Sequence, residues 1–145
     1  MQLLEGTGVL TYDPYRPGLK TKKDWWIVVN TDNEICRYYR WWVWNRYMID
    51  LQNPSWGAHL SVLRGGKPAE DKMHLWKKYQ GETIKFKYEA FVRHTGITGN
   101  EPNIFWYVDA WSDRLGEIRD ELGFTNTFDG KKIKYHLTCG KTWDH

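Results

Sequence analysis

Two short segments of the chain, His59-Leu60-Ser61-Val62 and His136-Leu137-Thr138-Cys139, repeat one pattern of histidine, apolar residue, hydroxyl residue and apolar residue. Successive side chains of an extended strand point to opposite faces, so each histidine shares a face with the hydroxyl two residues further on. The apolar residues between them can enter a core. One such tetrapeptide would carry little information, but two copies among five histidines are rarely found by chance.

The regions around the two segments share one order of elements. The run Trp25–Val29 predicts a strand, Thr31–Asn33 offers helix caps, Glu34–Tyr47 is assigned to a helix, and residues 58–63 form the first histidine strand. Later, Ile104–Trp111 predicts a strand, Ser112 caps a helix that runs to about Leu122, and Lys132–Cys139 forms the second histidine strand. We therefore predict an α+β fold in which duplicated β-α-β halves, about residues 25–64 and 103–140, form a bilobal, mainly antiparallel sheet core with flanking helices and a central cleft.

The segments outside these halves give weaker signals. Gly8–Tyr12 and Glu82–Val92 predict strands, and residues 69–80 predict a short helix. Turns are expected at Gly96–Pro102 and at Asp129-Gly130.

Composition bounds the class of protein. A chain of 145 residues predicts a single domain, 1–145, that can bury a core. The net charge of +3 is spread along the chain, which argues against a nucleic-acid arm or a membrane tail and favours a small anionic ligand. No run resembles a signal peptide or a membrane span, so the expected compartment is the cytoplasm. Cys36 and Cys139 give neither a disulfide framework nor a zinc spacing, and Cys139 is expected to be a small buried residue.

Aromatic and basic residues supply candidates for substrate binding. The chain has ten tryptophans, most of which should be structural, but Trp42, Trp106 or Trp111 could stack on a nucleobase. Arg64 and Lys141 each follow a histidine segment closely and could reach a phosphate, although a solvated charge is the simpler interpretation.

Other candidates are set aside. The histidines without the pattern (His74, His94 and His145) are expected at the surface, Arg37 and Arg40 are expected to be solvated charges, and Tyr135 is expected in the core. Asp109 and Asp113 do not combine with a histidine into a plausible metal set, so no metal site is expected.

The two segments resemble the paired His-x-[Ser/Thr]-x motifs that define the 2H phosphoesterase superfamily. Its members include LigT-like RNA ligases and cyclic phosphodiesterases, viral phosphodiesterases that cleave 2-5A, and phage anti-CBASS nucleases. The resemblance covers most of the chain from about Trp25, but only the two tetrapeptides are specific. Trp56-Gly57-Ala58 before the first segment is similar to small phage members, whereas Ser61 stands where threonine is commoner.

The resemblance implies catalysis by His59, Ser61, His136 and Thr138 without a metal or other cofactor. The residue types agree with that chemistry, because an imidazole titrates near neutral pH and can act as either acid or base. Hydroxyl donors can stabilise the charge that develops on phosphoryl oxygens. The sequence leaves open which histidine is the base, and whether water or a ribose 2′-OH attacks.

We expect a phosphodiesterase that cleaves small cyclic or 2′–5′/3′–5′-linked oligonucleotides, such as nucleotide immune signals during phage or viral infection. One alternative is the processing of 2′,3′-cyclic phosphates at RNA ends. Another, of a different class, is a non-catalytic module that binds nucleotides. The expected partner is a small anionic nucleotide, with neither a membrane nor a large nucleic acid.

Overall fold

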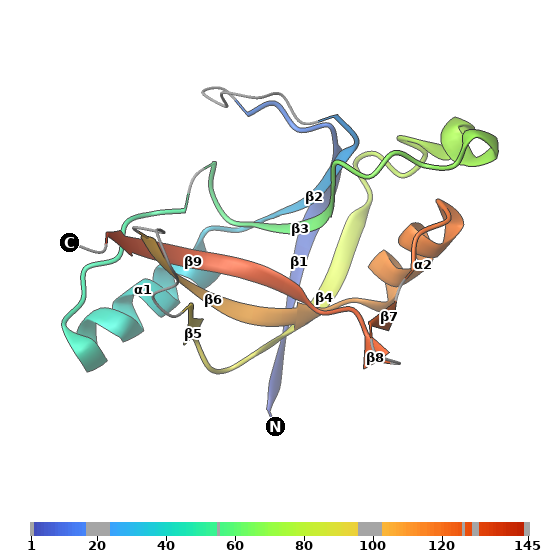
Figure 1. Ribbon diagram of the computed structural model, residues 1–145. Coiled ribbons are helices and arrows are strands. Elements are labelled where there is room, and N and C mark those ends of the chain that lie inside the picture. Colours follow the sequence, from blue (N-terminus) through green and yellow to red (C-terminus); the bar gives the residue numbers. More distant parts are fainter. Residues whose placement is uncertain are drawn as a thin grey trace.

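The computed structural model of the chain describes residues 2–16, 24–54, 56–95, 103–125, 127–128 and 131–143. The elements follow in the order β1 (Leu3–Tyr12), β2 (Trp26–Thr31), α1 (Glu34–Tyr47), β3 (His59–Arg64), the 3-10 helix η1 (Glu70–Leu75), β4 (Thr83–Glu89), β5 (Arg93–His94), β6 (Asn103–Trp111), α2 (Asp113–Glu121), β7 (Thr127–Phe128), β8 (Lys131–Lys132) and β9 (Tyr135–Trp143) (Figure 1).

Six strands close into a barrel. They are joined antiparallel in the order β4-β1-β2-β3-β9-β6, and β4 pairs again with β6 at Ala110 and Trp111 to close the ring. Strand β5 pairs with β6 at Trp106 and Tyr107, beyond the residues that β4 uses. The prediction of an α+β fold with a mainly antiparallel sheet is confirmed. The outline differs from the two separate lobes that we expected, because β4 bridges β1 and β6 and so joins the two parts of the sheet.

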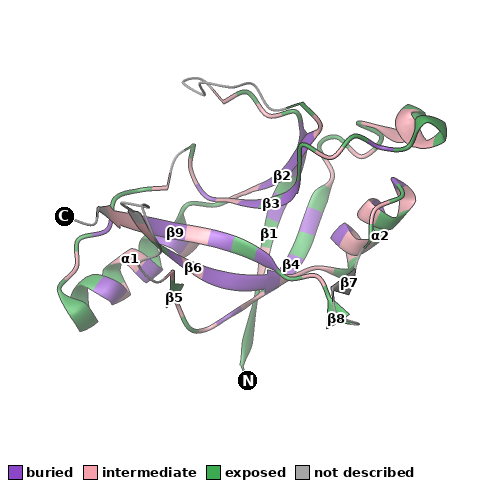
Figure 2. Cartoon of the chain, viewed as in Figure 1, coloured by how far each residue is buried: buried purple, intermediate pink, exposed green. Residues whose placement is uncertain are grey.

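The barrel interior is the main core of the protein. Leu10, Val29, Leu60, Val108 and Leu137 come from five strands, and all are fully buried in one cluster. Figure 2 shows buried and exposed residues alternating along β4 and β9, as expected for strands with one inner and one outer face. The helices α1 and α2 lie toward opposite ends of β9 in Figure 1, and both add buried side chains to this core.

Local sequence signals explain both helices. Helix α1 covers the predicted residues: the Asp32 carboxylate accepts a hydrogen bond from the Glu34 N–H at 2.8 Å, and the helix ends at Met48 in a left-handed conformation (φ 56°). Helix α2 begins after Ser112, whose Oγ accepts the Leu115 N–H at 3.3 Å, as the sequence predicted.

Three predicted elements differ in extent. The segment 69–80 holds only the six-residue η1 and then continues in turns, since Lys77 and Gly81 both adopt positive φ. Strand β1 starts at Leu3 rather than Gly8, because it pairs along its length with β4. The predicted strand 132–139 is divided: β8 pairs with β7, and β9 starts at Tyr135 and continues past Gly140. The predicted turns at 96–102 and 129–130, and His145, lie outside the described residues.

Candidate active site

Strands β3 and β9 bring the two histidine segments together. Leu60 pairs with Leu137 in an antiparallel ladder, and both leucines are fully buried in the barrel. Extending this register by one residue in each direction sets His59 opposite Thr138, and Ser61 opposite His136. Side chains opposite each other share a face, so all four project from the outer surface of the barrel.

The spacing of this group follows from sheet geometry. Side chains directly opposite across an antiparallel pair have Cβ atoms about 4.5–5.5 Å apart, and diagonal neighbours are about 7–8 Å apart. Each histidine therefore stands beside the hydroxyl of the other segment, and the two histidines are diagonal neighbours. A phosphate group can lie between the two rings and reach both hydroxyls.

His59 is fixed through its Nδ1 atom. Nδ1 lies 3.0 Å from the Gly57 carbonyl oxygen, which can only accept, so Nδ1 carries the proton and Nε2 is left as an acceptor. The loop before His59 is itself held, because the Asn33 side-chain oxygen at the start of α1 accepts the Ala58 N–H at 2.9 Å. Burial lowers the pKa of His59, the bond to Gly57 offsets part of this effect, and the nearby positive charges of Arg16 and Arg64 each lower the pKa by a smaller amount.

His136 has a different partner. Its Nδ1 lies 3.0 Å from a carboxylate oxygen of Asp109, the residue opposite it on β6, and the Tyr107 ring packs edge-on at 4.8 Å. The Asp109 side chain is only 5% exposed. The Nδ1–H donated to this carboxylate orients the ring and leaves Nε2 available on the outer surface.

A buried charge network holds Asp109. The Asp109 carboxylate lies 3.4 Å from Lys134 Nζ and 3.6 Å from Arg93 Nε. The main-chain N–H of Asp109 donates to the Glu89 carboxylate at 3.0 Å. Glu89 is fully buried and accepts two hydrogen bonds from Arg93, at 2.7 and 3.0 Å. Burial alone would raise the pKa of Glu89, but the bonds from Arg93 and from the Asp109 N–H outweigh it, and its pKa lies below the usual value.

Next to His59 lies a group of alternating arginines and tryptophans, Arg16, Trp26, Trp56 and Arg64, called here the Arg–Trp cluster. The Arg16 guanidinium lies 5.7 Å from the ring centres of both Trp26 and Trp56, and the Arg64 guanidinium lies 5.2 Å from that of Trp26. Trp26 Nε1 donates to Ser61 Oγ at 3.4 Å, which ties the cluster to the first histidine segment.

The Arg–Trp cluster suits an anion. Within the described part of the chain, neither arginine forms an ion pair with a carboxylate, and the buried Nε of Arg16 has no hydrogen-bond partner. Arg16 Nη2 donates to the Asn30 side chain at 3.2 Å, which holds the guanidinium beside the sheet. Unpaired guanidinium groups next to aromatic rings can bind the phosphate and the base of a nucleotide.

The other predicted binding residues are dispersed. Arg64 belongs to the Arg–Trp cluster, and Trp111 lies two residues beyond Asp109 on β6. Lys141 is on β9 opposite Phe105, and its main chain exchanges hydrogen bonds with Gln52 at 2.9 and 3.1 Å.

Two of the predicted stacking residues are structural. Trp106 is 6% exposed and packs with Val43 of α1 and with Leu51, on the opposite side of the sheet from His59 and His136. The half-buried Trp42 packs against the same group. Interpreting Trp106 as a base-stacking residue was therefore wrong: it precedes Tyr107 by one position and points to the face that α1 covers.

The remaining residues that the sequence singled out also have assigned places. Tyr135, Cys36 and Cys139 are buried, as predicted for Tyr135 and Cys139, and His74 and His94 are exposed. Arg40 donates to the Cys139 carbonyl at 3.0 Å, and Arg37 pairs with Glu34 at 3.2 Å on the surface of α1.

Sequence reasoning missed Asp109 as a partner of His136, and also missed Arg16, Trp26 and Trp56. For Asp109 a signal existed, since it is the one charged residue within the aromatic strand Ile104–Trp111. It was weighed only as a metal ligand. Within the described ranges, no group of three or more histidine, cysteine or acidic side chains is placed to hold a metal ion.

No family model, curated protein or solved structure matches this chain. Of the helices in the described residues, none is long and apolar enough to cross a membrane. The function is therefore inferred from the geometry of the site.

Proposed function

We propose that the protein is a metal-independent phosphodiesterase of the 2H type that acts on small cyclic or 2′–5′/3′–5′-linked oligonucleotides. The observation that carries the proposal is the pairing of Leu60 with Leu137 in the centre of the two segments. That register gives two imidazoles and two hydroxyls on one face, which is the set that phosphodiester cleavage needs.

The surroundings of the two histidines suggest their roles. His59 has an unprotonated Nε2 and a pKa below its usual value, which suits the general base. His136 is held through Nδ1 by the buried Asp109 carboxylate, which fixes the ring with Nε2 facing outward, the position that suits the general acid.

The proposed reaction is a single in-line displacement. His59 Nε2 takes a proton from the attacking water or ribose 2′-OH, whose oxygen forms the new bond to phosphorus. The bond from phosphorus to the leaving oxygen breaks, and His136 Nε2 gives that oxygen a proton. Ser61 and Thr138 donate hydrogen bonds to the non-bridging oxygens, where negative charge increases in the transition state. Proton exchange with solvent then returns both rings to their starting states.

The topology supports the finer fold prediction. The strand order β2-β3-β9-β6 is symmetric about its centre: β2 and β3 are joined through α1, and β6 and β9 have α2 between them in the chain. The central pair, β3 and β9, carries the two segments. We propose that these halves are the duplicated units of the 2H architecture, joined by β1 and β4 into one barrel.

A second candidate, of another class, is a non-catalytic module that sequesters a nucleotide. The Arg–Trp cluster favours it, because two arginines free of carboxylate partners within the described residues would hold a phosphate whether or not a bond is cleaved. The processing of 2′,3′-cyclic phosphates at RNA ends uses the same four residues and differs only in substrate. In either case we place the protein in the cytoplasm, where phage or viral immune signals occur.

The test is a turnover assay with a panel of substrates, carried out in EDTA. The panel contains cyclic dinucleotides, cyclic trinucleotides, 2-5A and 2′,3′-cyclic mononucleotides, with products separated by chromatography. We expect at least one to be cleaved, and we expect His59→Ala and His136→Ala each to lower kcat by about 10²-fold or more. His74→Ala, an exposed histidine without the motif, is the matched control. Binding without product from any substrate would favour the sequestering module, and full activity of either site variant would reject the mechanism.

A further inference from the structure

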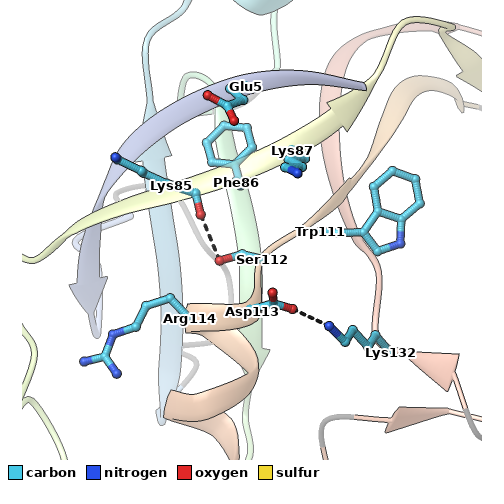
Figure 3. Close-up of a pocket in the computed structure, with 9 residues that line it drawn as sticks. All are labelled: Glu5, Lys85, Phe86, Lys87, Trp111, Ser112, Asp113, Arg114 and Lys132. Carbon is cyan, nitrogen blue, oxygen red and sulfur yellow. Dashed lines mark hydrogen bonds and ion pairs between the residues drawn. The ribbon is translucent and has the colours of Figure 1, made fainter. Parts of the chain in front are cut away.

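A pocket of about 480 Å³ lies on the outer side of β4 and β6 (Figure 3). Lys85, Lys87, Trp111 and Lys132 line it, together with Glu5, Phe86 and the first residues of α2. Its size is that of a site for a small organic ligand.

The pocket is built by a cross-strand row. Glu5 of β1 pairs with Lys87 of β4, and Lys87 pairs with Trp111 of β6, so the three side chains share the outer face. Lys85 lies two residues before Lys87 on the same face. Figure 3 shows Trp111 on one side of the pocket and Lys132 reaching toward Asp113, to which it is bonded at 2.6 Å.

The row that contains Trp111 is the next row along the sheet from the one that contains His136. Asp109 is opposite His136, and Trp111 follows Asp109 by two residues, so His136 and Trp111 are diagonal neighbours about 7–8 Å apart. Lys134 reaches Asp109 from the same side. One sugar–phosphate unit can cover this distance, so a chain held at His136 passes directly to the pocket.

The charges of the pocket are available to an anion. Lys85 and Lys87 are exposed, and within the described residues neither forms an ion pair, whereas Lys132 is paired with Asp113, and Arg114 is paired with Glu82. Two exposed lysines beside a half-buried indole combine a phosphate contact with a stacking surface, as in grooves that bind single strands, although Lys87 also faces Glu5 and lies near Asp113.

We propose that this pocket binds the nucleotide next to the scissile phosphate, and that the substrate is therefore an oligonucleotide rather than a cyclic mononucleotide. The inference rests on the proposed function for the location of the scissile phosphate. Trp111 stacks on the base of the neighbouring nucleotide, and Lys85 and Lys87 contact its phosphates.

The test measures binding apart from cleavage. Fluorescein-labelled tetra-adenylates with 3′–5′ and 2′–5′ linkages are titrated by anisotropy against protein that carries His59→Ala, over a range of salt concentrations. Lys85→Gln/Lys87→Gln should reduce the slope of log Kd against log salt by about 1.4, since each phosphate contact to a single strand contributes about 0.7. Arg37→Gln/Arg46→Gln removes the same charge from α1 and should leave the slope unchanged.

The stacking contact has its own variants. Trp111→Ala should weaken binding of the tetra-adenylate about 5- to 150-fold, the range for losing one base stack, and Trp111→Phe should recover most of it. Binding of adenosine 2′,3′-cyclic monophosphate, measured by competition, should not change in any of these variants. The lysine pair is exposed, so it tests the pocket even where Trp111→Ala affects folding.

The outcomes separate the two proposals. The proposed binding pocket would be overturned if Lys85→Gln/Lys87→Gln and Arg37→Gln/Arg46→Gln gave equal salt slopes. It would also be overturned if the pocket variants lost affinity equally for the tetra-adenylate and for the cyclic mononucleotide. Loss of tetra-adenylate binding in the pocket variants, combined with no cleavage of any substrate by the wild type, would support the pocket and reject the phosphodiesterase.

Discussion

Asp109→Asn tests the pairing on which the proposed acid depends. The substitution keeps the size of the Asp109 side chain and removes the negative charge that contacts His136. If the bond to Asp109 holds the His136 ring in the orientation that delivers the proton, kcat should fall while KM changes little, because the alignment matters in the chemical step and not when substrate binds.

The magnitude follows from the geometry. A hydrogen bond contributes about 1 kcal/mol net where water competes for the partners and about 4–6 kcal/mol in an apolar medium. The Nδ1–oxygen distance is 3.0 Å, and the carboxylate is 5% exposed whereas the His136 side chain is 54% exposed. An intermediate value of about 1.5–3 kcal/mol corresponds to a loss of about 10- to 150-fold in kcat.

The assay compares two leaving groups. With the nucleotide substrate, the leaving ribose oxygen needs a proton from His136. With a p-nitrophenyl phosphodiester it does not, since nitrophenolate leaves without protonation. The defect of Asp109→Asn should therefore shrink on the nitrophenyl ester, whereas that of His59→Ala should persist.

Two controls separate the loss of this charge from a general loss of charge or of folding. Asp120→Asn removes an exposed carboxylate of α2 and should leave kcat unchanged. A urea unfolding curve reports how far the variant is destabilised, because Asp109 also neutralises Lys134 and Arg93. The proposed role of Asp109 is refuted if Asp109→Asn keeps kcat within about twofold of the Asp120→Asn control, or loses the same factor on both esters.

Three further predictions concern the base and the fold. Arg64 is one cause of the lowered pKa of His59, so Arg64→Gln should raise that pKa and move the acidic limb of the kcat/KM profile to higher pH; an unmoved limb would exclude His59 as the titrating base. A Cβ at Gly140 would lie 2.8 Å from Leu51 Cβ, so Gly140→Ala should lower the free energy of unfolding by about 1–3 kcal/mol, and an unchanged urea midpoint would contradict this packing. Ser112→Ala removes the cap of α2 and should cost about 1 kcal/mol in the same measurement, against no change if the cap bond does not form.

The parts of the fold that the sequence predicts are local. The alternation along Glu82–Val92 and the cap at Ser112 identify β4 and α2, because each signal lies within the element it describes. For the same reason, the spacing of His59 and Ser61 already implies a shared face on one strand.

The parts that could not be predicted depend on which strands become neighbours. Periodicity does not tell that β4 pairs with both β1 and β6, nor that Leu60 stands opposite Leu137. It also does not tell which face a helix covers, which is why Trp106 was wrongly assigned to the binding surface. Asp109 acquires its role only from the register of β6 on β9, since a buried carboxylate in an aromatic strand has no partner until the strands are aligned.

The two segments share one residue pattern, but one histidine lies near arginines and the other contacts a carboxylate, and a two-histidine mechanism needs such a difference. At a single pH one ring must be neutral to accept a proton while the other is protonated to give one. Two histidines in equal surroundings would titrate together, and only a fraction of the molecules would hold the productive combination. Here burial and two arginines disfavour charge on His59, whereas the Nδ1 atom of His136 contacts a buried carboxylate. The duplicated strands therefore supply matching geometry, and residues outside the two histidine segments, Arg16 and Asp109 among them, give the two histidines different surroundings.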